Sequence, residues 1–390
     1  MNVDDVQGNV LAGFNKPHQR FALLALSRQV DEAKRWLGEL ERHVASHGEV
    51  VAHNRAAAWK RGDRPVWVGV GVTRSGLARL GAERLDRALA DHWAFAQGAA
   101  ARAVDLGDVG DSDPAGWVFG SGPDAVDAVV TVAGDDEVPV DERLRDLLDA
   151  ASERGADVVH VQPAARLEGG REHFGFKDGG HQPLVEELND GTGDARLADF
   201  VLPPDAEPTW LALASFQVLR LLAQDVAGWR EAATPGEERI GRRADGGDLP
   251  RVPASSHVGK TRPPARFGPE RRRLMRRGIP YGPPYDTAPA EERGLVFNAF
   301  MASIDGQYEH IQRLWANKAD FPAPDTGWDP VIGGPDPDAA RTYRTGVAQP
   351  LYPPRHVTTR GAVYAVALSV PALKELSSSG VVTSAAFGNL

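Results

Sequence analysis

The sequence of 390 residues contains no cysteine. This absence excludes a disulfide framework, a thiol nucleophile, an iron–sulfur cluster and a cysteine-ligated zinc site. Any metal must therefore be held by histidine, by carboxylates or through a prosthetic group. Positive charge is in deficit as well, because 44 Lys and Arg face 54 Asp and Glu, for a formal net charge of -10. Binding to a phosphate backbone needs a concentrated basic surface, so we expect no nucleic-acid partner.

Long apolar runs are also missing. No run approaches the roughly 18 residues that a membrane span requires. The first residues, Met-Asn-Val-Asp-Asp, carry acid where a secretory signal would carry positive charge. We therefore expect no membrane partner and a cytoplasmic location.

The first 165 residues alternate between strand-like and helix-like patterns. Helical spacing of apolar residues predicts helices at 30–45, 77–93 and 142–151. Apolar or β-branched runs predict strands at 21–27, 66–73, 128–133 and 158–161. Apart from the extra helix after the second strand, the order is strand–helix–strand–strand–helix–strand. This order predicts a ferredoxin-like domain over 1–165, with an antiparallel sheet and its helices on one face.

The remaining chain, 166–390, begins with a long loop at 166–208 that is rich in Gly, Asp, Pro and charge. Loops of this length usually bind something or link domains. The earlier alternation then restarts, with strands expected at 210–222, 294–303 and 362–369 and helices at 223–233 and 307–315. We therefore predict an α+β chain of two ferredoxin-like domains. The Arg-, Gly- and Pro-rich insertion 234–292 is expected to build a site.

Three segments carry residues suited to chemistry. In 173–183, Asp178 stands between glycines and follows two phenylalanines. The segment is either a turn or a site where a ligand can approach the carboxylate, whose pKa the aromatic walls would raise. In 255–263, His257 is a solvated loop residue or a metal ligand. In 271–282, five arginines within seven positions precede Gly-Ile-Pro-Tyr-Gly, which predicts an anion-binding patch or a cation beside Asp178.

Together with the opening Val6–Leu11, these segments resemble the dye-decolourising peroxidase family, which binds haem b in the second of two ferredoxin-like domains. Residues 175–179 match the family's G-x-x-D-G motif, and His257 falls at the position of the proximal iron ligand. The segment 275–278 matches the one that carries the distal arginine, which aligns with Arg276. Residues 294–305 and 329–334 are also similar to family segments.

The resemblance implies a haem peroxidase that reduces hydrogen peroxide and oxidises dyes, phenols or similar reducing substrates through a ferryl intermediate. Asp178 would move the proton during cleavage of the peroxide bond, and Arg276 would stabilise the negative charge that develops. The alternative is a haem-binding or iron-handling protein without turnover. The oligomeric state stays open, with a homo-oligomer among the options.

The same resemblance implies further contacts to the cofactor. Asp305, or Glu309 as second choice, would accept the ring N–H of His257. Gly179 would let the cofactor approach. A glycine at position 259 stands where many relatives have Arg, so the propionates would bind Lys260 or Arg262.

Leu295 and Phe297, two positions apart on one strand, would form the wall of the distal pocket. His181 would be an additional acid–base group or a polar part of the access channel. Bulky dyes would deliver electrons through surface aromatics, for which the candidates are Tyr281, Tyr285, Trp315 and Trp328.

Overall fold

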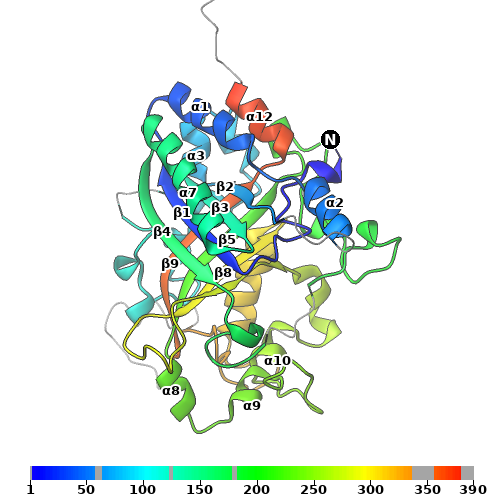
Figure 1. The fold of residues 1–390 in the computed structure, drawn as a ribbon. Helices are drawn as coiled ribbons and strands as arrows, with labels where there is room; N and C mark the ends of the chain where they lie inside the picture. Colours follow the sequence, from blue (N-terminus) through cyan, green and yellow to red (C-terminus); the bar gives the residue numbers. More distant parts are fainter. Residues whose placement is uncertain (1, 58–63, 123–125, 178–181, 336–354, 379–390) are drawn as a thin grey trace, which may run out of the picture.

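The computed structural model describes residues 2–57, 64–122, 126–177, 182–335 and 355–378. Within these ranges the strands form one sheet with the order β4-β1-β3-β2-β9-β5-β8-β6, and β7 also pairs with β8 (Figure 1). All pairings are antiparallel. The strands are β1 (His18–Ala25), β2 (Trp67–Val72), β3 (Ala128–Gly134), β4 (Asp157–Ala165), β5 (Ser215–Gln224), β6 (Met275–Arg276), β7 (Ile279–Tyr281), β8 (Gly294–Met301) and β9 (Val357–Ala367).

The first four strands have the order β4-β1-β3-β2. Helices α1 (Val30–Glu41) and α2 (His47–Ala57) lie between β1 and β2, and α7 (Glu137–Glu153) connects β3 to β4. Two strand–helix–strand units produce this order when their strands alternate in one antiparallel sheet. The predicted ferredoxin-like half is therefore confirmed. Apolar residues spaced by three or four positions explain the buried face of α7, on which Val140, Leu144 and Leu147 lie.

The second half repeats this order as β9-β5-β8, with β6 and β7 on the outer edge of β8. The predicted second ferredoxin-like unit is thus present. The first of its strands begins later than expected, at Ser215, because Thr209–Leu211 forms a short helical turn. After β8 the chain continues into the helices η10 (Ile304–Glu309) and η11 (Ile311–Ala316), and α12 (Val370–Ser378) follows β9.

The helix predicted at 77–93 is wrong as a single element. The chain forms α3 (Arg74–Arg79), α4 (Leu85–Ala88) and α5 (Trp93–Gln97) instead. Between α3 and α4 the backbone turns left-handed at Gly81 (φ 64°) and at Arg84 (φ 54°), and a left-handed residue ends a right-handed helix. Apolar spacing alone does not report such breaks.

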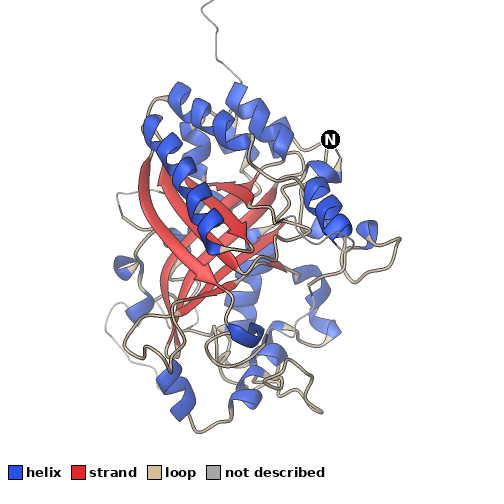
Figure 2. Cartoon of the chain, in the orientation of Figure 1, coloured by secondary structure: helices blue, strands red, loops and turns tan. Residues whose placement is uncertain are grey.

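The two halves join in the middle of the sheet, where Val72 of β2 pairs with Val366 of β9. Gln7 reinforces this junction. Its side-chain amide donates to the carbonyls of Val70 (2.7 Å) and Leu368 (2.9 Å), and its oxygen accepts from the N–H of Val70 (2.8 Å). At the far ends of the order, β4 also contacts β7, which bends the sheet toward a barrel (Figure 2).

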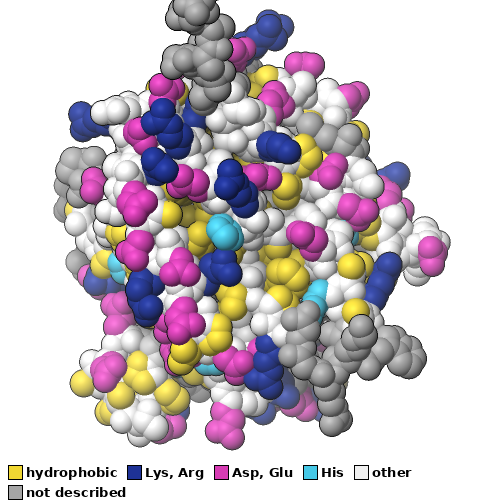
Figure 3. All heavy atoms as spheres, turned by 45° about the horizontal axis from the view of Figure 1, so that its top comes forward, with side chains coloured by type: hydrophobic (Ala, Val, Ile, Leu, Met, Phe, Trp, Pro, Cys, Tyr) yellow, Lys and Arg dark blue, Asp and Glu magenta, His cyan; other side chains and the backbone are white. Residues whose placement is uncertain are grey.

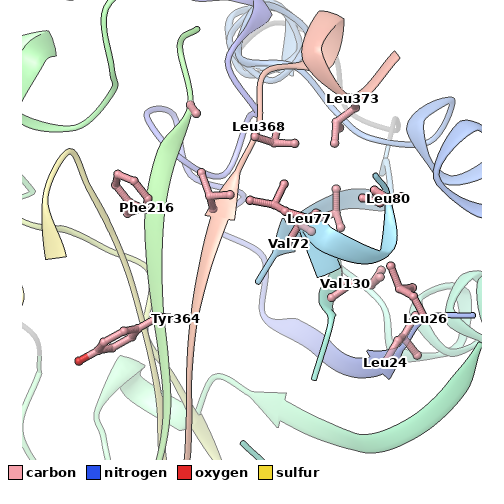
Figure 4. Close-up of a cluster of buried hydrophobic side chains, with 14 of the residues drawn as sticks. Leu24, Leu26, Val72, Leu77, Leu80, Val130, Phe216, Tyr364, Leu368 and Leu373 are labelled. Atoms are coloured by element: carbon pink, nitrogen blue, oxygen red, sulfur yellow. The ribbon is translucent and has the colours of Figure 1, made fainter. Parts of the chain in front are cut away.

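One hydrophobic core crosses the junction. Helices α1, α3 and α12 pack on the same side of the sheet (Figure 1). Figure 4 shows buried side chains from both halves in one cluster: Leu24, Leu26, Val72, Leu77, Leu80 and Val130 of the first, and Phe216, Tyr364, Leu368 and Leu373 of the second. The halves therefore cannot separate without exposing apolar surface.

Beyond the strand ends of the second half lies a lobe of short helices, α8 (Val226–Glu231), α9 (Gly236–Ile240) and α10 (His257–Thr261), at the bottom of Figure 1. It contains the first part of the insertion 234–292 that the sequence singles out, and a later part of that insertion forms β6 and β7 of the sheet. Acidic and basic side chains are interspersed on the face that Figure 3 shows, without a broad basic patch. In the described ranges no helix has both the length and the apolar character needed to cross a membrane.

Candidate active site

A cavity of about 850 Å³ lies between the lobe of short helices and the sheet. Both halves of the chain line it, from Asn9 and Gln19 near the start to Thr359 on β9. This volume suits a large cofactor. Its apolar lining includes Phe174, Leu222, Val258, Leu295, Phe297 and Ile311.

His257 lines this cavity from the first position of α10. The helix begins there because the Ser256 hydroxyl accepts the N–H of Gly259 (3.0 Å), which caps the first turn. Nδ1 of the imidazole lies 2.9 Å and 3.1 Å from the two carboxylate oxygens of Asp329. A proton on Nδ1 shared with a carboxylate makes Nε2 the nitrogen that coordinates a metal.

Asp329 is fully buried. Burial by itself would raise its pKa, but His257 and the N–H groups of Ile332 (3.0 Å) and Val331 (2.8 Å) together hold the pKa below its usual value. The carboxylate therefore stays ionised and can accept a hydrogen bond from the imidazole N–H. A carboxylate in this position raises the basicity of a ligating histidine.

The prediction that Asp305 or Glu309 is the partner of His257 is wrong. Asp305 instead accepts from the hydroxyl of Ser303 (3.0 Å), and Glu309 pairs with Arg102 (2.9 Å). The acceptor is Asp329, which enters the site from a turn 72 positions along the chain from the histidine. The only sequence signal for it was the family-like segment 329–334.

Lys260 was expected at a propionate, and the structure contradicts this. Its side chain is fully buried, and its ammonium donates to the carbonyls of Lys318 and Phe321, both at 2.6 Å. Lys260 is not among the cavity-lining residues, whereas Arg262 is. Burial, together with the nearby Arg273, Arg276 and Arg242, lowers the pKa of Arg262, as expected in a crowded cationic region. An anion in the cavity would relieve this repulsion.

The two consecutive arginines of the third motif have different surroundings. Arg277 donates to the carbonyls of Asn9 (2.8 Å), Val10 (3.1 Å) and Leu11 (2.7 Å), which ties the amino-terminal motif to this segment. Burial and then the charge of Arg276 lower the pKa of Arg277 to about 10. Arg276 itself lines the cavity, and its backbone N–H donates to the side chain of Gln182 (2.9 Å). Both arginines line the cavity, and the role of Arg276 stays a prediction.

Leu295 and Phe297 both line the cavity, two positions apart on β8, as predicted. The ring of Phe297 packs against Tyr308, with centroids 5.9 Å apart. Asp178, Gly179 and His181 lie outside the described residues, so their predicted roles stay predictions.

The loop that leads to Asp178 is described as far as residue 177, and sequence reasoning missed the residue that shapes it. Glu172 accepts the N–H groups of Phe174 (2.9 Å) and Phe176 (3.0 Å) and the side-chain amide of Gln224 (2.6 Å). Burial is the main cause that raises the pKa of this carboxyl. It fixes the turn that carries the two phenylalanines.

Sequence reasoning also missed a cluster of four buried polar residues in the cavity wall. Arg220 donates to Asp108 and to the hydroxyl of Tyr308, and Thr359 donates to Asp108 (2.7 Å). All four residues line the cavity. They come from four distant parts of the chain, so no local pattern could have united them.

Three of the four aromatic residues expected at the surface are buried: Tyr281 at 5% exposure, Trp315 at 3% and Trp328 at 8%. Their prediction as surface entry points for electrons is therefore wrong, because these large aromatic side chains pack into the interior. Tyr285 is half-buried, and the guanidinium of Arg230 lies 4.9 Å from its ring centroid.

The donor set suits one kind of metal cofactor. Among the described residues there is no group of three or more His, Asp or Glu that could hold a bare ion. A single carboxylate-backed histidine, apolar walls and a cationic region with Arg262 and Arg276 fit a planar, anionic iron porphyrin.

Two family models match the chain. Residues 5–167 match the family model described as the DyP dimeric alpha+beta barrel domain, and residues 170–322 match the model of the carboxy-terminal domain of Dyp-type peroxidases. The chain belongs to the dye-decolourising peroxidase family. Members of this family are haem peroxidases that act on dyes with hydrogen peroxide, and the chain is an oxidoreductase of this kind; the alternative of an iron-handling protein is not favoured.

Among its relatives is a multifunctional dye peroxidase of an Amycolatopsis species, 28% identical, with 96% of each chain covered. A dye-decolorizing peroxidase of Auricularia auricula-judae is 25% identical over 85% of this chain and 78% of its own. Two solved structures share the fold. An ancestral D-type dye-decolorizing peroxidase has a TM-score of 0.80 at 24% identity, covering 97% of this chain and 99% of the other. The DyP-type peroxidase of Anabaena sp. has a TM-score of 0.77 at 24% identity, covering 96% and 94%.

Proposed function

We propose that His257 ligates the haem iron from one side of the cavity and that Arg276 acts on the opposite side. In this arrangement the chain reduces hydrogen peroxide and takes the electrons from an organic reducing substrate. The observation that carries the proposal is the contact between Nδ1 of His257 and the buried carboxylate of Asp329 at 2.9 Å. A solvated loop histidine would not need such a partner.

Haem b, when bound, supplies the iron at which peroxide is reduced and the ring that stores the oxidising equivalents. Asp329 holds the proton on Nδ1 of His257, which fixes the ring tautomer and makes Nε2 a stronger donor. Its backbone contacts to Val331 and Ile332 keep the carboxylate ionised and in place.

Arg276 supplies a permanent positive charge where negative charge develops as the peroxide bond breaks. Its guanidinium stays protonated at working pH and cannot accept a proton, so a separate group must move the proton. Asp178 is the predicted carrier for this step. Gly179 beside it would leave room for the cofactor, and Leu295 and Phe297 would exclude water from the same region.

Arg262 is the proposed partner of a haem propionate. It lines the cavity, and the neighbouring guanidinium groups of Arg273, Arg276 and Arg242 make an anion favourable there. We propose dyes and phenols as reducing substrates, in keeping with the printed names of the relatives. A homo-oligomer is proposed from the description of the first family model as a dimeric domain, and sedimentation analysis would test it. The cytoplasmic location and the domain boundary at 165/166 stay predictions.

The function is tested by stopped-flow mixing of haem-loaded protein with peroxide. We expect Asp178→Asn and Arg276→Leu each to slow the reaction by about tenfold or more, or roughly 1.4 kcal/mol of barrier. Arg271→Leu is the matched control, because Arg271 is exposed and outside the cavity lining. His257→Ala should lose the axial ligand and alter the absorption spectrum of the haem. Full rates in both distal variants would contradict the assignment of the distal residues.

A further inference from the structure

The ammonium group of Lys260 occupies an interior position that the peroxidase function does not explain. The side chain is fully buried, three positions after His257 on α10. It has no place in the cavity lining. A buried lysine is costly unless its ammonium is hydrogen-bonded, so its partners indicate what it does.

The partners are carbonyl groups of one segment, Trp315–Phe321, at the end of η11. Nζ lies 2.6 Å from the carbonyl oxygens of Lys318 and Phe321 and 3.4 Å from that of Trp315. The carbonyl of Trp315 belongs to the last turn of η11, where backbone acceptors lack partners within the helix, and those of Lys318 and Phe321 lie in the loop that follows. Lys260 therefore joins α10, which begins with His257, to this segment.

The same segment holds the acceptor of the imidazole proton. The backbone N–H of Asp329 donates to the carbonyl of Ala316 (2.9 Å). His257 and Asp329 are thus attached to one platform, defined here as residues 315–321: the histidine through Lys260, and the aspartate through Ala316. The distance between the imidazole and the carboxylate depends on both attachments.

We propose that Lys260 is a positioning residue that sets the hydrogen bond between His257 and Asp329, and through it the electron donation of the histidine to the haem iron. This inference rests on the proposed ligand role of His257. A second line of support is the local charge. Burial lowers the pKa of Lys260 to about 8, while Asp329 and Asp320 act in the opposite direction. The ammonium therefore keeps its charge at pH 7, and with it three donors for the platform carbonyls.

The chemistry gives the direction of the effect. If the platform loosens, the bond between Nδ1 and the carboxylate lengthens, and the imidazole becomes a poorer donor. A poorer axial donor stabilises ferric iron less, so the midpoint potential of the haem shifts to more positive values. Direct removal of the acceptor charge in Asp329→Asn must shift the potential in the same direction.

The experiment compares the haem-loaded wild type with Lys260→Met, Lys260→Gln and Asp329→Asn. The readouts are the midpoint potential and the iron–histidine stretching frequency of the ferrous form. We expect a positive shift of the potential and a lowered frequency in all three variants, largest in Asp329→Asn and smallest in Lys260→Gln, which keeps an amide donor group. Lys34→Met is the matched control: Lys34 is a buried lysine on α1 in the first half of the chain, and its loss should leave both readouts unchanged.

Two results would overturn the inference. In the first, the Lys260 variants lower the melting temperature but keep the wild-type potential and frequency. In the second, both Lys260 variants fail to fold while Asp329→Asn binds haem normally, which would assign the lysine to fold stability alone. His257→Ala, measured in parallel, tests the proposed function separately, since an unchanged haem spectrum there contradicts the ligand assignment itself.

Discussion

His310 lies between η10 and η11 with two cationic neighbours. Burial first, and then the charges of Arg272 and Arg313, lower its pKa to about 4. The unfolded chain binds a proton at a higher pH than the folded protein does, so the contribution of His310 to stability is complete above its unfolded pKa of about 6.5. It is lost as the pH falls from there toward 4.

We therefore expect His310→Gln to flatten the pH dependence of stability. The measurement is the free energy of unfolding by denaturant at pH 7, 5.5 and 4.5, in wild type and variant. The variant loses the ring contact with Trp315, whose centroid is 5.2 Å away, so its absolute stability falls at every pH. The slope decides the question: parallel curves for the two proteins would contradict the prediction.

Arg277 allows a second prediction at the scale of single residues. Arg277→Met leaves three backbone carbonyls, those of Asn9, Val10 and Leu11, without their donor. Each buried acceptor left unpaired costs about 1–3 kcal/mol, so the free energy of unfolding should fall by roughly 3 kcal/mol or more. Chemical denaturation measures this loss. Arg271→Met, at an exposed position, is the control and should change stability little.

At the same scale, the sequence predicted that His257, Arg276, Leu295 and Phe297 belong to one site, and all four line the cavity, because motifs and strand alternation are local. It did not identify Asp329 as the partner of the imidazole, since the contact depends on how a remote turn packs. Lys260 was misassigned for a related reason. A charged side chain near a predicted ligand suggests contact with solvent or with a propionate, and only the fold shows that Lys260 packs against the carboxyl end of η11.

At the scale of secondary-structure elements, the close approach of β5 and β8 depends on Gly294. A Cβ atom there would lie 1.9 Å from the carbonyl oxygen of Leu222 and 2.8 Å from the ring of Tyr281. Gly294→Ala must therefore separate β8 from β5 or displace β7. We expect a loss of about 3 kcal/mol or more in stability.

Thermal and chemical denaturation of Gly294→Ala would measure this loss. Leu222 and Leu295 both line the cavity, so haem affinity should fall as well. Gly116→Ala is the control, because a Cβ atom at Gly116 meets nothing within 4 Å. Wild-type stability in Gly294→Ala would contradict the register of the two strands.

Strands were the elements most readily predicted. Their β-branched runs at 66–73 and 128–133 correspond closely to β2 and β3. The helical region after β2 was not, because apolar spacing continues across the left-handed residues Gly81 and Arg84 that divide it. The lobe of α8, α9 and α10 has helices too short to produce a periodic signal.

At the scale of the whole molecule, a buried ion pair fastens the halves together. Arg102 of α6 (Ala99–Arg102) donates to both carboxylate oxygens of Glu309, which also accepts from the hydroxyl of Tyr364 (3.1 Å). Glu309 is fully buried. Arg102→Met would leave this charge without its main counter-ion, and breaking a buried pair costs about 3–5 kcal/mol.

We expect Arg102→Met to lower the melting temperature of the entire chain while unfolding stays a single transition, because the sheet and the hydrophobic core are shared between the halves. Differential scanning calorimetry measures both quantities. Arg64→Met is the control; its ion pair with Asp136 is exposed, and no measurable change is expected. Two separate transitions in the variant would show that the halves unfold independently.

The central place of β9 has a consequence for how the enzyme is made. Among the described residues this strand comes last in the sequence, yet it lies between β2 and β5 and brings Val357 and Thr359 to the cavity wall. A ribosome delivers the amino-terminal portion first. Haem therefore has no complete pocket to bind until translation has passed β9, and we expect it to bind after synthesis.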